Sequence, residues 1–356
     1  MKASHFLRVR LADALTPIVV ILIGLLIGCI PIIIAGENPL PTYAQLFYGA
    51  FGNMDNLAST LVRSIPVAIT GVGVSVTAKS GLFNMGGPGQ LLLGAITAAA
   101  VGAAINLPRA LSIPLVLLSG IIGGMLGALL PAVLESKFRM NVLVVTLLFN
   151  YVISLFVTFM VNYRLRDTTV AGLAQETRPI SDAARLTRIV PGTRLHTGIF
   201  IALAVVLVAS FFLKKSVLGY ELRMSGFNPF FAEYGGLNRA KIVLVAMLIS
   251  GALAGLAGSI EVCGVYHRFV VDTLDEHAWT GITASLLGNA NPVGVLIAAV
   301  LVSALNTGAL GLTRTTNVPI EIASIVQAVI VLFIASRLGV QSWLLGLERR
   351  HKERAQ

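Results

Sequence analysis

Few residues of this 356-residue chain have the types and spacing that chemistry requires. The stretch from Gly73 to Ser80, GVSVTAKS, differs by one residue from the phosphate-binding pattern G-x-x-x-x-G-K-[ST], because Ala78 stands where the second glycine belongs. That loop needs glycine to bend its amides around phosphate, and it follows a strand of an α/β domain. Here the stretch ends an apolar run, so it predicts no nucleotide site, and Lys79 is interpreted as an anchor at the cytoplasmic membrane interface.

A second group of side chains that could bind a metal or transfer protons lies at residues 267–277. It contains two histidines and three carboxylates: His267, Asp272, Asp275, Glu276 and His277. No zinc spacing such as H-E-x-x-H is present, and the sequence contains no nucleophile elbow or catalytic triad. A hydrated external loop is the preferred interpretation, with no metal site and no enzymatic activity.

Residues 80–90, SGLFNMGGPGQ, interrupt two apolar runs with glycines, a proline and the side-chain amides of Asn84 and Gln90. Broken backbone at membrane depth is tolerated only against protein or a water-filled cavity. The stretch therefore indicates either a solute path or strained helix junction within a membrane, or an ordinary cytoplasmic turn between two helices. The composition favours neither alternative.

Two carboxylates, Glu261 and Glu321, lie in or beside apolar runs, where a charge is costly and usually faces a bundle interior. Glu321 follows Pro319 by two residues, so a helix N-terminal turn explains its charge. For Glu261 the alternatives are a transport pathway and a helix end in the headgroup region.

The elements that must position these residues are membrane helices. Hydrophobic residues make up 56% of the chain and charged residues 12%, with a mean hydropathy of +0.86. The apolar residues form blocks of about 20, the length that crosses a bilayer. The formal charge of +10 follows from basic residues between these blocks, so nucleic-acid binding is not expected. Cys29 and Cys263 are interpreted as packing residues.

The apolar blocks predict an all-α, polytopic integral membrane protein with about ten helices. The first is interpreted as a retained helix because it is longer than the apolar core of a secretion signal. The eighth is too short to span a membrane and is predicted to be a half-helix broken at Asn289, Asn291 and Pro292. The expected helices are 15–35, 57–78, 83–106, 111–134, 142–162, 197–213, 241–265, 278–289, 293–312 and 320–337.

Charge between the helices predicts cytoplasmic N- and C-termini, although the Arg-rich stretch 163–196, placed outside, argues against this orientation. Glycines at helical spacing are expected to allow close helix packing: Gly120 with Gly124, Gly123 with Gly127, and Gly251 with Gly255.

Five segments in order resemble one transporter family. They are GLFNMGGPGQLLLGA from Gly81, NVLVVTLLFNY from Asn141, GYELRMSGFNPFFAEYGGLN from Gly219, SGALAGLAGSIEVCG from Ser250 and LLGNANPVG from Leu286. Over about residues 36–310 the chain resembles permease subunits of ABC importers for nucleosides and simple sugars, a superfamily that includes ribose and branched-chain amino acid permeases. The likeness is closest to the nucleoside branch. Pro88 and Val142 replace family glutamates, which weakens the substrate assignment.

The resemblance implies one permease domain over residues 1–356, with an extracytoplasmic loop at 163–196 and a basic cytoplasmic tail at 338–356. It implies a prokaryotic plasma (inner) membrane protein that binds no cofactor and works by alternating access. Its expected partners are an ABC ATPase subunit that uses ATP, a second permease subunit or another copy of itself, an extracytoplasmic solute-binding protein and the lipid bilayer. The residues expected to form the solute path are Phe83, Asn84, Gln90, Asn150, Tyr151 and Glu261, since amides and a phenol can exchange hydrogen bonds with a polar solute.

A cytoplasmic coupling segment is implied at residues 214–240, where the chain would dock on the ATPase. Helix-forming residues from Pro229 to Tyr234, closed by two glycines, agree with a short helix there. The residues expected to contact the ATPase are Arg223, Gly226, Asn228, Pro229, Ala232, Tyr234, Gly235 and Asn238. Two alternatives stay open: a simple-sugar permease, and a secondary transporter driven by an ion gradient.

Overall fold

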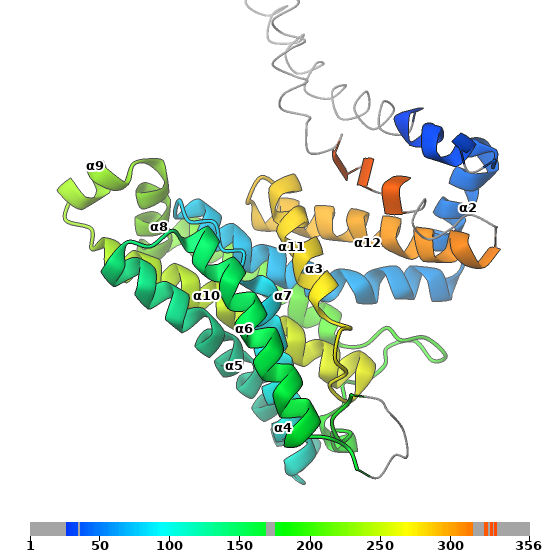
Figure 1. Ribbon diagram of the computed structural model, residues 1–356, viewed down its shortest axis with the longest axis horizontal. Helices are drawn as coiled ribbons and strands as arrows, with labels where there is room; N and C mark the ends of the chain where they lie inside the picture. The colour runs from blue at the N-terminus through cyan, green and yellow to red at the C-terminus, as the bar shows by residue number, and fades with distance from the viewer. Residues whose placement is uncertain are drawn as a thin grey trace, which may run out of the picture. The chain divides into compact units, whose positions relative to one another are not determined.

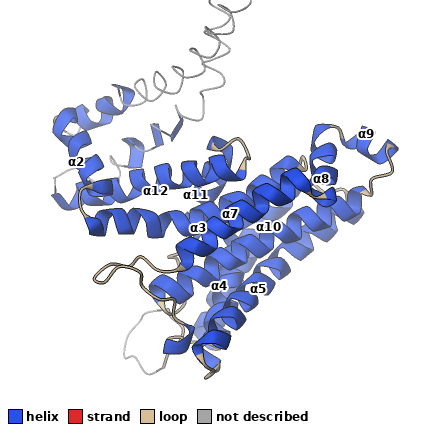
Figure 2. Ribbon diagram, turned by 180° about the vertical axis from the view of Figure 1, so that it is seen from behind, coloured by secondary structure: helices blue, strands red, loops and turns tan. Residues whose placement is uncertain are grey.

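The computed structural model describes residues 26–34, 36–168 and 175–315, with 324–326, 328, 329, 331 and 332. Within these residues the regular structure is helical, and only three isolated bridges pair extended backbone (Figures 1 and 2). The all-α prediction is confirmed. Residues 15–25 of the predicted helix 15–35, most of the predicted helix 320–337 with Glu321, and the tail 338–356 lie outside the described residues.

Eight predicted helices are present with small shifts of their ends. They are α3 (Met54–Lys79), α4 (Gly87–Ala104), α5 (Arg109–Phe138), α6 (Val142–Tyr163), α7 (Gly198–Lys215), α10 (Arg239–Glu261), α11 (Asp275–Leu287) and α12 (Pro292–Thr315). A π-helix, η2 (Val262–Tyr266), continues α10, and a 3₁₀ turn, η1 (Asp182–Ala184), interrupts the long loop. The short α9 (Pro229–Tyr234) was also predicted.

Two helices were missed by the sequence analysis because neither is an apolar block. The Asn38 side chain caps α2 (Pro39–Phe51) by accepting a hydrogen bond from Leu40 N, with proline in the first turn. The Ser216 hydroxyl caps α8 (Val217–Phe227) by accepting from Gly219 N. Both begin at capping residues and are shorter than a membrane-spanning apolar run.

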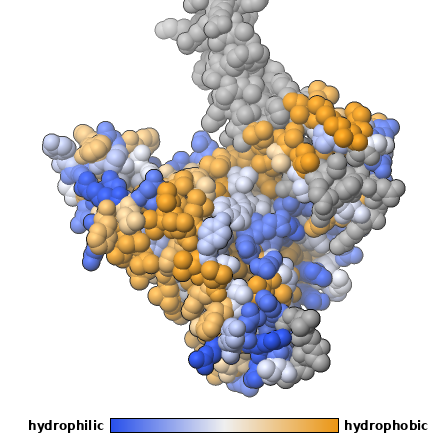
Figure 3. Space-filling model, in the orientation of Figure 1, coloured by the Kyte–Doolittle hydropathy of each residue, from blue (hydrophilic) through white to orange (hydrophobic). Residues whose placement is uncertain are grey.

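Seven described helices are long and apolar enough to cross a membrane: α3, α4, α5, α6, α7, α10 with η2, and α12. Large apolar side chains are exposed on α5, α6 and α7, and among them Leu155 of α6 and Phe211 of α7 are 73% and 68% exposed. Figure 3 shows the apolar surface that this produces over α5 and α6. Such exposure is explained by lipid contact. The chain is a multi-pass membrane protein, and α11, with 13 residues, is the short eighth helix that the sequence predicts.

The described chain belongs to two compact units, and each has its own packing. In the unit that contains α2 and α12 from Ala304 onward, Gly49 of α2 lies against Gly308 and Gly311. The larger unit, Ala58–Ser303, contains the remaining helices.

In the larger unit, α10 packs on α5 and α4 through the predicted glycines. A Cβ added at Gly124 would collide with the backbone of Gly251, and one added at Gly255 would collide with Gly120. The absence of these Cβ atoms lets the two backbones touch, as in small-residue packing of membrane helices. The prediction that these glycines allow close helix packing is confirmed.

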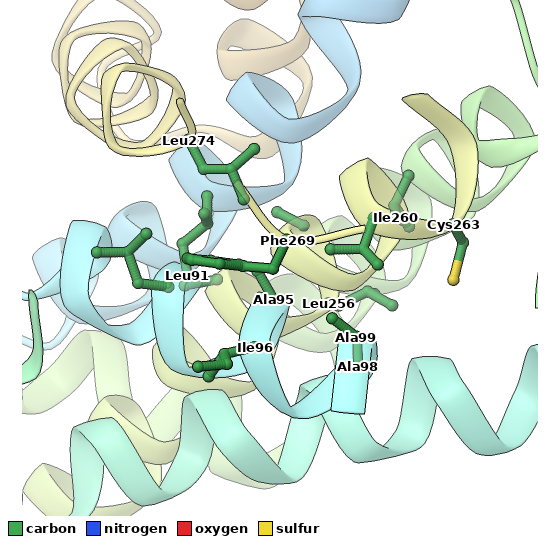
Figure 4. Close-up of a cluster of buried hydrophobic side chains, with 14 of the residues drawn as sticks. Leu91, Ala95, Ile96, Ala98, Ala99, Leu256, Ile260, Cys263, Phe269 and Leu274 are labelled. Atoms are coloured by element: carbon green, nitrogen blue, oxygen red, sulfur yellow. The ribbon is translucent and has the colours of Figure 1, made fainter. Parts of the chain in front are cut away.

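An apolar cluster of α4 and α10 side chains is closed by the loop after η2 (Figure 4). Phe269 and Leu274 of this loop are fully buried among Leu91, Ala95 and Ile260. The loop is thereby fixed to the end of the helix bundle.

Contacts between segments show which parts of the chain lie at each end of the helix bundle in the larger unit. At one end Arg239, which begins α10, pairs with Glu135 near the end of α5, and α8 contacts the end of α3 through Gly226 and Lys79. At the other end the backbone amide of Leu186 donates to Cys263 O at 2.9 Å. The ranges 214–240 and 175–196 therefore lie at opposite ends of the unit, which we call the coupling end and the loop end.

Candidate functional site

The break between α3 and α4 is held by side-chain amides. Asn84 Nδ2 donates to Gln90 Oε1 at 3.1 Å and to Ser250 Oγ of α10 at 3.0 Å. Asn84 Oδ1 accepts from Gly86 N at 2.8 Å. The backbone amides released by the helix break thus find partners inside the protein, as membrane burial requires.

The same break is bonded to α6. Asn150 Oδ1 accepts from Gly89 N at 3.0 Å, and Asn150 Nδ2 donates to Met85 O at 2.8 Å. Met85 N donates to Thr146 Oγ1 at 3.2 Å. These bonds and those of Asn84 form one network, which we call the amide junction.

The amide junction lies within the length of the spanning helices rather than at their ends. Ser250 is 11 residues beyond Arg239, or about 16 Å at 1.5 Å per residue, and Asn150 is about 12 Å beyond the start of α6. Both distances start at the coupling end. Of the two alternatives for residues 80–90, a junction at membrane depth agrees with this geometry and an ordinary surface turn does not.

The expected path residues occupy three different places. Asn84, Gln90 and Asn150 come together in the amide junction, where Asn84 and Gln90 are 0% and 1% exposed. Phe83 belongs to the same loop and is half-buried. Tyr151 is 72% exposed on the outer surface of α6, so the structure does not bring it to the junction.

Glu261, the sixth expected residue, lies at the last turn of α10 and is 2% exposed. Its Oε2 is 4.0 Å from His277 Nε2 of α11. Within the described part of the chain, Glu261 Oε1 and His277 Nδ1 are buried without hydrogen-bond partners. A buried carboxylate and imidazole with free atoms are chemically able to accept and donate hydrogen bonds to a solute.

An ion pair between α3 and α11 lies near this carboxylate. Arg63 of α3 binds Glu276 of α11 at 2.8 Å, and it also attracts Glu261 electrostatically. The π-helix η2 follows Glu261 directly, and π-turns in α-helices often occur at functional sites. Glu261, His277, Arg63 and Glu276, which we call the carboxylate cluster, join three helices about 16 Å along α10 from Ser250.

His277 corrects one interpretation made from the sequence. It was assigned to a hydrated external loop, but it lies in the first turns of α11 and is 7% exposed. Asp275 and Glu276 begin that helix, where negative charge is favourable. In the described residues no group of three His, Cys, Asp or Glu side chains could hold a metal ion. The start of α11 was predicted too late because the residues before Ala278 do not form an apolar block.

Two asparagines of the predicted coupling segment cap the helices that follow them. Asn228 Oδ1 accepts from Phe231 N at 3.0 Å and caps α9, in which Pro229 takes the first position. Asn238 Oδ1 accepts from Lys241 N at 3.1 Å and caps α10. These bonds explain the two asparagines and the proline.

The other expected coupling residues divide into buried and exposed positions. Ala232 packs inward and Gly226 touches the end of α3, whereas Tyr234 is 94% exposed before the helix stop at Gly235. Arg223 is half-buried and donates from Nε to Gly219 O at 3.4 Å. Exposed aromatic side chains gather on this segment: Phe227, Phe230, Phe231 and Tyr234.

A buried histidine links the long loop to α7 at the loop end. His196 Nδ1 accepts from Gly198 N at 3.1 Å, and its ring is wholly buried against Gly264. Burial, followed by the charge of His267, lowers the pKa of His196 to about 4. Burial and then Arg185 lower the pKa of His267 as well. Both shifts favour the neutral form of the imidazole rings of His196 and His267 at the loop end.

Comparison with known families decides the class of this protein. The family model described as "Branched-chain amino acid transport system / permease component" matches residues 56–335. The chain belongs to this permease family. The match covers both the amide junction and the carboxylate cluster.

The permease is also similar to proteins with more specific names. It is 33% identical to the guanosine ABC transporter permease protein NupP of Bacillus subtilis, over 93% of this chain and 96% of the relative. It is 31% identical to the nucleoside ABC transporter permease protein NupB of Lactococcus lactis, over 93% of each. With the glucose ABC transporter permease protein TsgB13 of Haloferax volcanii the identity is 28%, over 93% and 90%. The predicted family is confirmed.

Both departures from the family pattern are accommodated in the permease. Pro88 lies in the first turn of α4, where a missing backbone N–H costs nothing. Val142 is the first residue of α6 and packs with Val243 and Met247 of α10.

Proposed function

We propose that this permease is the membrane subunit of an ATP-driven importer that takes up nucleosides. The observation that carries the proposal is the 33% identity to a guanosine permease over almost the whole of both chains. The glucose permease is similar at 28%, so a simple sugar is the second candidate substrate.

The energy would come from a separate ABC ATPase at the coupling end. The exposed aromatic side chains of α8 and α9 suit a docking surface, because large apolar groups anchor protein interfaces. Closure of the ATPase would then pull on residues 214–240 and change the packing of the bundle by alternating access. A second permease subunit or another copy would complete the pore, and an extracytoplasmic binding protein would deliver solute at the loop end.

The carboxylate cluster is the part of the proposed path that could bind solute directly. A carboxylate accepts two parallel hydrogen bonds, and a nucleoside offers such donor pairs as ribose hydroxyls or base N–H groups. Glu261 Oε1 and His277 Nδ1 are free for this role within the described residues. The polar atoms of Asn84 and Asn150 already form hydrogen bonds within the protein. Their proposed role is therefore to stabilise the break between α3 and α4 beside the path.

Uptake by intact cells tests the substrate class. Cells in which the gene is deleted are compared with cells in which it is restored, and entry of labelled guanosine is measured with an excess of unlabelled uridine, ribose or glucose. The proposal expects restored uptake that other nucleosides reduce and the sugars do not. Uptake that glucose or ribose abolishes, with no effect of uridine, would transfer the assignment to the sugar branch.

A further inference from the structure

A cavity of about 390 Å³ lies at the coupling end, between the ends of α3 and α7, the helix α8 and the turn before α12. Three cations line it, one from each helix: Lys79, Lys214 and Arg223. Apart from the amide of Asn291, the remaining lining residues are apolar or small, among them Leu213 and Phe227. The cavity is a basic pocket with apolar walls.

The three cations are not neutralised by the protein. No carboxylate lines the cavity, and within the described residues none of the three cations forms an ion pair. Lys79 Nζ donates only to a neutral group, Asn289 O, at 3.3 Å. Three like charges around one hollow repel one another, so an anion bound between them is stabilised.

The outer surface next to the cavity is suited to a lipid chain. Leu207 and Phe211 are 67% and 68% exposed, and with Lys214 they occupy positions i, i+4 and i+7 on one face of α7. This apolar stripe runs from the middle of a membrane-spanning helix to the cations at its end. A headgroup held by the cations would place its acyl chains along this stripe. A small soluble anion would use the cations and leave the stripe without a role.

We propose that this cavity binds the phosphate of an anionic phospholipid. Basic pockets between spanning helices are known to bind such headgroups. Because Arg223, Gly226 and Phe227 of the wall belong to the predicted coupling segment, a bound lipid would tie α8 to the ends of α3 and α7. The inference needs no assumption about the transported solute.

The test measures lipid binding by the full-length protein. Purified protein in neutral detergent is titrated with phosphatidylglycerol, with phosphatidylcholine or with inorganic phosphate, and occupancy is read by native mass spectrometry. The unaltered chain is expected to bind one phosphatidylglycerol in preference to phosphatidylcholine. Lys214→Ala is expected to weaken this binding about fivefold, and Lys79→Ala with Lys214→Ala about thirtyfold, because each basic residue contributes separately.

Matched controls are available at the same end of the unit, Lys215 on α7 and Lys241 on α10. Lys215→Ala is the control for Lys214→Ala, and Lys215→Ala with Lys241→Ala is the control for the double variant. Each control removes the same number of charges near the coupling end from residues that do not line the cavity, so it should leave the affinity for phosphatidylglycerol unchanged. Equal melting temperatures of the lipid-free variants would show that all of them are folded.

Three results would overturn the proposal. The control pair could weaken phosphatidylglycerol binding as much as the cavity pair, which would indicate general surface charge. Millimolar inorganic phosphate could displace the lipid, which would indicate a site for a free anion. The cavity pair could abolish assembly with the ATPase subunit while lipid binding stays normal, in which case a protein carboxylate is the ligand.

Discussion

The ion pair between Arg239 and Glu135 provides a sharp test of how the coupling end is held together. Arg239 Nη2 lies 2.5 Å from Glu135 Oε1, and the two side chains are 36% and 4% exposed. The pair joins the last turns of α5 to the first turn of α10. Replacing Arg239 by alanine would leave a buried carboxylate without its cation.

The cost of this change follows from the burial of Glu135. Removing one partner of a buried pair destabilises a protein by about 3 to 5 kcal/mol. Since Arg239 is partly exposed, water can enter and reduce the cost to about 2 or 3 kcal/mol. At roughly 2 °C per kcal/mol for a large domain, Arg239→Ala should lower the apparent melting temperature by about 5 °C.

The assay is thermal unfolding of the purified protein in detergent, with Lys241→Ala as the matched control. Lys241 is an exposed cation two residues further along α10, so its loss should change the melting temperature by less than about 1 °C. Adding Glu135→Gln to Arg239→Ala removes the uncompensated charge and should restore most of the loss. The reasoning is refuted if Arg239→Ala and Lys241→Ala melt together, or if the double variant is less stable than Arg239→Ala alone.

Three further changes have definite expected outcomes. Gly255→Ala should destabilise the bundle by about 1 to 3 kcal/mol in thermal unfolding, because its Cβ meets backbone of α5. Gly87→Ala should not, because its Cβ would meet only Ala278 Cβ, at an ordinary contact distance of 3.7 Å, and equal melting temperatures of the two variants would contradict this packing. The pKa of His196 is about 4 in the folded protein, below its ordinary value near 6.5, so the unfolded chain takes up a proton first as the pH falls. The free energy of unfolding should therefore be at its full value above about pH 6.5 and fall by on the order of 2 kcal/mol toward pH 5. His196→Asn keeps an acceptor for Gly198 N–H, and its free energy of unfolding should fall less between pH 6.5 and pH 5. If the variant loses as much stability over this range as the unaltered chain, His196 is not the cause of the pH dependence. Glu261→Gln should reduce solute uptake at least tenfold while the amount of protein in the membrane stays normal. Uptake equal to that of the unaltered chain would show that Glu261 does not bind solute.

The spanning helices could be predicted because each is an apolar block of sufficient length. The glycine contacts between α5 and α10 were also predictable, since spacing of four residues places two small side chains on one helix face. The short helices α2 and α8 could not be found in this way, because their stability depends on caps and on contacts with other segments rather than on length.

The bonding partners in the amide junction could not be predicted from the sequence. The side-chain amides of residues 80–90 were recognised as unusual, but their partners Ser250 and Asn150 lie far along the chain, on helices whose packing the sequence does not specify. His277 was misplaced because no apolar block marks the start of α11, and only the fold of that helix brings it to Glu261. Tyr151 follows Asn150 in the chain, but successive helical residues point about 100° apart, and it faces outward.

The source of energy is the most direct test of the account. The permease is reconstituted in liposomes with the proposed partners: a second permease subunit, an ABC ATPase and a solute-binding protein. Entry of labelled guanosine is followed with and without ATP on the ATPase side. The account predicts accumulation that needs both ATP and the ATPase and that persists when ion gradients are collapsed. Accumulation by the permease alone, driven by a proton or sodium gradient, would contradict it.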